Sequence, residues 1–148
     1  MTYPGVIYCL AMSLSLLGCI DEKNGSEDTS HKSFADFEKY VTSSSGNDSV
    51  NCGTVGIGMS VLDTNTCVVE SFVNHTSFQA IYRWQGTDSS IASAITMSSN
   101  GVILLWRFDG SIDGSPNGPS LIVKTECLDP QLTGTVDDVY AQLFNCGP

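Results

Sequence analysis

Alternating apolar and polar side chains run through much of the second half of the chain. Successive residues of a strand point to opposite faces of a sheet, so a period of two predicts strands. We therefore expect strands over residues 78–85, 90–97, 102–109 and 120–126. Residues typical of turns separate them at 86–89, 98–101 and 110–119, which indicates antiparallel pairing of consecutive strands.

A helical period precedes these strands. In residues 63–74 apolar side chains recur four apart, as at Val68 and Phe72, and Asp63 is the expected N-terminal cap. The tail over residues 136–146 fits a short helix slightly better than a strand. One helix followed by four strands predicts an α+β domain, in which one helix packs on a four-stranded antiparallel meander.

One face of that sheet is the candidate binding surface. The Tyr-Arg-Trp and Trp-Arg-Phe triplets of the first and third strands match each other, so their aromatic rings should face the helix. The opposite face is either covered by the tail or exposed. Its expected members are Arg83, Arg107, Ile81, Ile103 and Leu105.

The N-terminal stretch has the pattern of an export signal. Residues 6–17 form an apolar run of 12 residues, the length of a signal-peptide core and too short to span a bilayer. The following Leu16-Leu17-Gly18-Cys19 resembles the lipobox of bacterial lipoproteins, and the body resembles small exported lipoproteins without an assigned role. The lipobox resemblance implies cleavage before Cys19, lipid on its sulfur and a membrane anchor. An ordinary cleaved signal and an uncleaved anchor are the alternatives.

This resemblance divides the chain into three parts. Residues 1–18 are the expected signal peptide, 19–50 the lipidated cysteine with a flexible polar tether, and 51–148 the folded domain. Ile20, rather than an acidic residue, follows Cys19, which by resemblance favours the outer membrane. Within the tether, residues 33–41 predict a short helix capped by Ser33 with Asp36, either packed on the domain edge or docking a partner.

The cysteines support an oxidising compartment. Cys9 leaves with the signal peptide and Cys19 takes the lipid, so an even number remains for disulfides: Cys52, Cys67, Cys127 and Cys146. Of the three possible connectivities we favour Cys52–Cys67 and Cys127–Cys146, because each closes a short local loop. A zinc site is the rival interpretation, but close Cys-x-x-Cys pairs are absent from the sequence.

The charge balance limits the classes of partner. Sixteen acidic and 6 basic residues give a formal net charge of −10, and the basic residues are scattered singly. Nucleic-acid binding needs clustered Lys and Arg, so we expect none. Anionic lipids do not attract such a surface either, so membrane contact should come from the lipid.

Few patterns point to chemistry. No nucleophile elbow occurs, the histidines are only two, and Gly56-Ile57-Gly58 lacks the third glycine of a dinucleotide fingerprint. We expect no enzyme activity and no cofactor beyond weak calcium. Residues 109–115 resemble the opening of an EF-hand loop, with Asp109, Ser111 and Asp113 as ligands, but Ser120 stands where that family has a bidentate Glu.

The sequence therefore predicts an anchored envelope lipoprotein that binds an unidentified envelope protein without catalysis. The sheet loosely resembles cystatin-like and small inhibitor-type sheets, so an inhibitor-like or immunity-like module acting on a secreted enzyme is one alternative. A calcium-dependent adhesion or sensing module is another.

Overall fold

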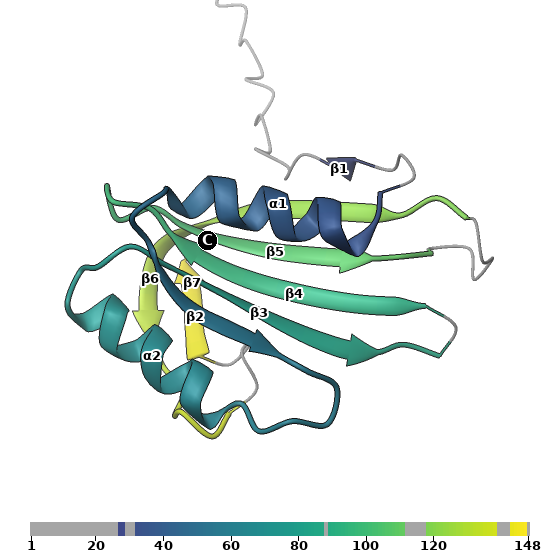
Figure 1. Ribbon diagram of the computed structural model, residues 1–148. Helices are drawn as coiled ribbons and strands as arrows, with labels where there is room; N and C mark the ends of the chain where they lie inside the picture. The colour runs from purple at the N-terminus through teal and green to yellow at the C-terminus, as the bar shows by residue number, and fades with distance from the viewer. Residues whose placement is uncertain (1–26, 29–31, 88, 112–117, 139–142, 148) are drawn as a thin grey trace, which may run out of the picture.

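The computed structural model describes residues 27–28, 32–87, 89–111, 118–138 and 143–147. A twisted mixed sheet lies between two helices, with α1 (Phe34–Ser45) above it and α2 (Leu62–Val73) below it in Figure 1. The strands are β1 (Glu27–Asp28), β2 (Val50–Val55), β3 (Phe78–Gln85), β4 (Ser90–Met97), β5 (Ile103–Asp109), β6 (Leu121–Leu132) and β7 (Phe144–Gly147). Their order is β1-β6-β5-β4-β3-β2, and β7 also pairs with β6.

The predicted architecture of one helix on a four-stranded antiparallel meander is wrong. The described chain has two helices, and β2 adds a strand that runs parallel to β3. Parallel neighbours need a crossover connection, which α2 supplies. β2 escaped prediction because Gly53 has a φ of 97° and the β2–β3 register shifts between Asn51 and Thr54, so no clean alternation marks the strand.

Helix α1 packs on the sheet and is part of its core. Ser33 and Asp36 form the expected capping box, in which each side chain accepts a hydrogen bond from the other residue's backbone N–H. Phe37 and Val41 are fully buried against strands β3 to β6. The packed part of the chain therefore starts upstream of residue 51, inside the stretch for which a tether was expected.

Helix α2 covers the opposite face near β2 and β3. Its core comprises Val68 and side chains of the sheet and tail, including Phe78, Ala80, Tyr82, Ile95, Ile103 and Phe144. The expected cap is wrong, because the N-cap is Val61 without a side-chain cap bond, and Asp63 lies in the first turn. The helix ends at Val73, one residue before the predicted end, with Asn74 as its C-cap, and His75 follows with a φ of 52°.

Both predicted disulfides are confirmed. Cys52–Cys67 joins β2 to α2, and Cys127–Cys146 joins β6 to β7. The tail ends in strand β7 rather than the slightly favoured helix, and Phe144 packs edge-on against Phe72 of α2 at a centroid distance of 4.9 Å. Among the described residues, no helix is both long and apolar enough to cross a membrane.

Candidate functional site

The residues predicted to share one binding face lie on two faces. The register pairs Arg83 with Ala92, and Ala92 with Phe108. Arg83 therefore lies on the same face of the sheet as Phe108, an aromatic residue of the second triplet. Arg107 instead pairs with Ser93, which pairs with Tyr82. Within each triplet the alternation holds, but the antiparallel register offsets the two arginines by one residue.

This placement divides the set between the helices. Ile81 belongs to the cluster under α1, whereas Ile103 belongs to the cluster on the α2 face and Leu105 packs against it. Ile81 and Ile103 are buried, at 6% and 0% exposed. Only the two arginines of the set are exposed, and they lie on opposite faces. The predicted five-residue surface does not exist as a unit.

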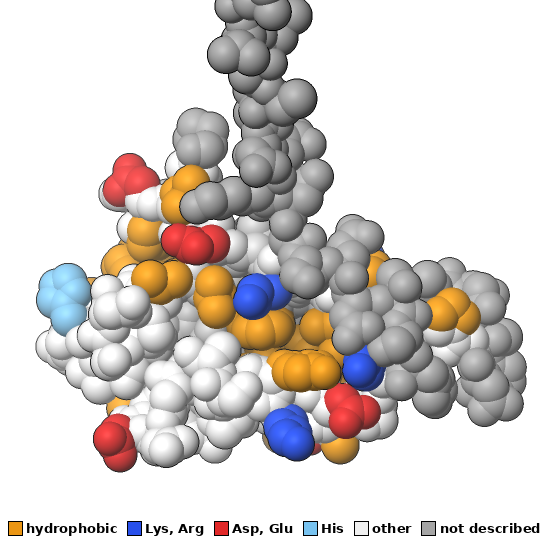
Figure 2. Space-filling model, turned by 90° about the horizontal axis from the view of Figure 1, so that it is seen from above, with side chains coloured by type: hydrophobic (Ala, Val, Ile, Leu, Met, Phe, Trp, Pro, Cys, Tyr) orange, Lys and Arg blue, Asp and Glu red, His pale blue; other side chains and the backbone are white. Residues whose placement is uncertain are grey.

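Basic side chains on the α1 face cover aromatic rings. The Arg83 guanidinium lies 4.5 Å from the Phe34 ring centroid, and the Lys124 ammonium lies 5.8 Å from that of Trp106. Figure 2 shows this face, with apolar side chains gathered in its middle and Lys and Arg at their border. Both contacts have cation–π geometry and shield the edge of the α1 core. This face is accordingly closed by its own side chains.

The predicted calcium ligands are only partly described. The Asp109 carboxylate accepts hydrogen bonds from the Ser89 hydroxyl at 2.8 Å and the Ser111 backbone N–H at 3.2 Å, both at Oδ1. Asp113 lies outside the described residues. Within the described part of the chain, no three His, Cys, Asp or Glu side chains form a cluster that could hold a metal. The described geometry thus gives Asp109 a local role in joining the ends of β4 and β5.

Among the described residues, the most exposed apolar segment is the one over residues 56–62, which joins β2 to α2 and ends at the first residue of that helix; we call it loop 56–62. Three of its side chains are open to solvent: Ile57 at 52%, Met59 at 68% and Leu62 at 42% exposed. The Met59 backbone N–H donates to the Gly56 carbonyl at 3.1 Å, and Gly58 has a φ of 74°. The two glycines therefore form a tight turn that presents apolar side chains outward.

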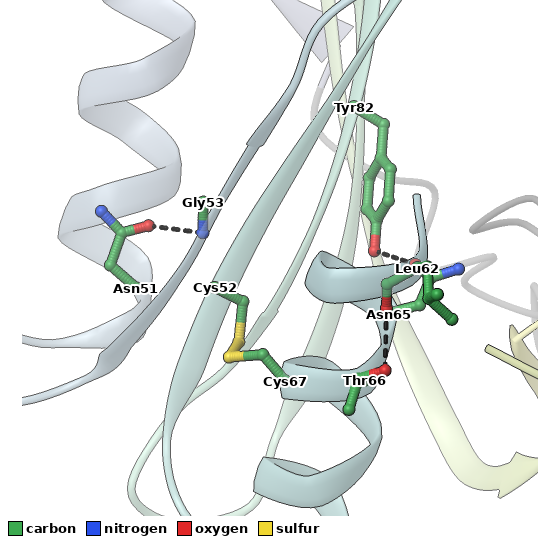
Figure 3. The surroundings of a disulfide bond; sticks show 8 residues. All are labelled: Asn51, Cys52, Gly53, Leu62, Asn65, Thr66, Cys67 and Tyr82. Atoms are coloured by element: carbon green, nitrogen blue, oxygen red, sulfur yellow. Dashed lines mark hydrogen bonds between the residues drawn. A yellow bond between two sulfur atoms is a disulfide. The ribbon is translucent and has the colours of Figure 1, made fainter. Parts of the chain in front are cut away.

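Both ends of loop 56–62 are fixed. Cys52 and Cys67 are bonded with a Cα separation of 5.5 Å, and Figure 3 shows this bond joining the strand before the loop to the helix after it. The Met59 side chain also packs on Gly56, because a Cβ there would lie 2.9 Å from the Met59 sulfur and the side chain would have to move. The loop is thus a constrained apolar projection.

A buried polar side chain holds the tail beside this loop. Asn65, fully buried on the first turns of α2, accepts a 2.7 Å hydrogen bond from the Tyr82 hydroxyl, drawn in Figure 3. Its amide nitrogen donates to the backbone carbonyls of Val136 at 2.9 Å and Asp138 at 2.8 Å. No buried side-chain polar atom in the described residues lacks a partner. This hydrogen-bond network therefore holds the backbone of residues 136–138 against the start of α2.

Sequence reasoning missed loop 56–62 as a surface. Its signal was present, since Ile57, Met59, Val61 and Leu62 lie between turn residues without fitting a helix. Comparison of the chain with protein-family models, curated proteins and solved structures finds no match, so no catalytic family or structural neighbour is identified.

Proposed function

We propose that the protein is a membrane-anchored lipoprotein of the cell envelope, and that its domain is a non-catalytic binding module that contacts a partner protein through loop 56–62. The observation that carries this proposal is the exposure of Ile57, Met59 and Leu62 on a loop that Cys52–Cys67 closes. Apolar side chains clustered on a surface are a common mark of an interaction site.

The energetics support such a role. Completing the burial of three large apolar side chains that are roughly half exposed is worth about 3 kcal/mol. A loop that is already constrained loses less conformational entropy on binding than a free one. Among the described residues, this segment therefore combines exposed apolar area with a low loss of conformational entropy on binding.

The anchor is supported by Leu16-Leu17-Gly18-Cys19 and by two disulfides, which belong to an oxidising compartment. We place the protein at the outer membrane in preference to the inner membrane. Intact-mass measurement of the membrane-extracted protein should give a chain starting at Cys19 and carrying acyl groups. The Cys19→Ser variant should lose the acyl mass. A wild-type chain cleaved elsewhere and free of lipid would refute the anchor.

The binding role is tested by a photo-crosslinking residue placed at Ile57 in the producing cells. The matched control places it at Val73, which is 62% exposed but lies at the end of α2. We expect one discrete protein adduct from position 57 and none from position 73. Equal adducts at both positions, or none at position 57, would contradict the proposal.

An inhibitor-like module is the second candidate, because an exposed apolar loop bracketed by a disulfide could enter an enzyme cleft. It predicts that the adduct from position 57 is a secreted hydrolase, and that the purified protein lowers the activity of that hydrolase. Unchanged hydrolase activity in the presence of saturating protein would exclude inhibition and leave simple binding.

A further inference from the structure

On the premise that loop 56–62 is the contact surface, we propose that its partner is a protein with an apolar pocket bordered by Lys and Arg side chains. The feature behind this inference is a strong separation of charge in the fold. Residues 40–82 and 125–148 contain seven acidic residues and no Lys or Arg. These two stretches include β2, the loop, α2 and β7.

Printed contacts bring the two stretches together on one side of the molecule. Phe72 of α2 packs on Phe144 of β7, and the Asn65 amide nitrogen holds the backbone at Val136 and Asp138. Figure 1 shows α2 and β7 on the same side, below the sheet. The acids of α2 and of residues 136–138 therefore share one side, which we call the acidic side.

Acidic residues lie directly beside the apolar loop. Asp63 follows Leu62 in the first turn of α2 and is exposed. Asp137 is exposed between the two backbone groups that Asn65 holds, so it lies next to the same turn. The loop thus has an apolar centre and an acidic rim, and the complementary surface has an apolar pocket and a basic rim.

All but one of the described basic side chains lie away from the acidic side. Lys39 is on α1, and Arg83 and Lys124 cover aromatic rings on the α1 face. Lys32 precedes α1, and Arg107 is the exception, because its register with Ser93 and Tyr82 places it on β5 at the face that α2 covers. Neither Asp63 nor Asp137 has a Lys or Arg as a sequence neighbour, and the acids of this side outnumber Arg107, so we expect the rim to keep a negative potential.

The same charges disfavour two other occupants. An anionic lipid surface would repel the acidic rim, so insertion of the loop into the bilayer is opposed. A second copy docked through the same loop would bring two acidic rims together, because a two-fold interface repeats each surface patch. A basic protein surface is the occupant that the charge distribution favours.

The test uses the full chain and the protein crosslinked from position 57. After both are purified, their affinity is measured at low and high salt for three variants. Asp63→Asn with Asp137→Asn removes the rim charges, Ile57→Ser removes an apolar contact, and Asp48→Asn is the control for losing an acidic charge away from the loop. Asp48 precedes β2, at the end of that strand remote from the loop.

We expect the rim variant to weaken binding roughly tenfold at low salt, mainly through slower association, and to lose most of that effect at high salt. Asp48→Asn should leave the affinity unchanged, and Ile57→Ser should weaken binding at both salt concentrations. An effect of Ile57→Ser without any effect of rim charge or salt would overturn the basic-rim proposal and keep the loop as contact surface. An adduct with lipid or with a second copy of this chain would overturn the inferred partner, and no adduct would refute the proposed function itself.

Discussion

Removing the two disulfides one at a time separates their effect on loop 56–62 from their effect on the whole fold. One variant replaces Cys52 and Cys67 by alanine, and the other replaces Cys127 and Cys146. The pairs are well matched, because Cys52 is 9% and Cys127 4% exposed and both belong to the same core cluster. They differ in what they enclose, since only Cys52–Cys67 brackets the loop.

The expected loss of stability is almost equal for both variants. The bonded cysteines are 15 and 19 residues apart, and the chain-entropy model assigns about 3 kcal/mol to closing either loop. Both variants should therefore unfold at similarly lowered urea midpoints. The bonded backbone N–H groups of Met59 and Asn65 should nevertheless exchange with solvent about tenfold faster only in the Cys52/Cys67 variant.

Urea unfolding measures the global effect, and native-state hydrogen exchange followed by NMR measures the local one. Comparing two variants of equal global stability removes exchange that occurs through complete unfolding. Equal exchange rates at Met59 in both variants would refute the argument that the Cys52–Cys67 bond constrains the loop. A much larger loss of global stability in one variant would show that the two loops are not equivalent in the unfolded chain.

Further predictions concern the Tyr82–Asn65 hydrogen bond, the α1 cap and the candidate calcium site. Tyr82→Phe leaves Oδ1 of buried Asn65 without its donor, so urea unfolding should show a loss of about 1–3 kcal/mol, and an unchanged midpoint would argue against this network. Ser33→Ala removes the α1 cap, which should cost about 1 kcal/mol in the same assay. The side-chain and backbone hydrogen bonds of Ser33 lower the pKa of Asp36, so their contribution is full above the ordinary aspartate pKa and disappears as pH falls through the lowered one. The Ser33→Ala variant should accordingly lose less stability than wild type on acidification below about pH 4, and parallel pH profiles would contradict this. If residues 109–115 bind calcium, millimolar calcium should raise the melting temperature of wild type but not that of Asp109→Ala. An unchanged melting curve of wild type would remove the calcium hypothesis.

Local patterns predicted the local elements well. Strands β3 and β4 have the predicted bounds, and the turn at Ser98 forms with the Gly101 backbone N–H donating to the Ser98 carbonyl at 2.9 Å. Alternation and turn residues act over a few positions, which is why sequence suffices for them. Both disulfides were predictable for the same reason, because each closes a short loop.

Features that depend on distant pairing were not predictable. The register that puts Arg83 and Arg107 on opposite faces is set between strands, and a one-residue offset reverses a whole face. The packing of α1 also depends on a distant partner, because Phe37 stacks on Phe108 at a centroid distance of 5.4 Å. Its short apolar face gave no sign of the sheet that it covers.

The position of strand β1 limits how far a lipid at Cys19 would let the domain move. Strand β1 begins at Glu27 and pairs with β6, so eight peptide steps link the two residues and span at most about 30 Å. A free chain over residues 19–50 would have reached roughly 110 Å. Figure 1 shows β1 on the α1 side of the sheet, so this side would lie near the bilayer surface. The acidic side, below the sheet in Figure 1, would then face the aqueous space.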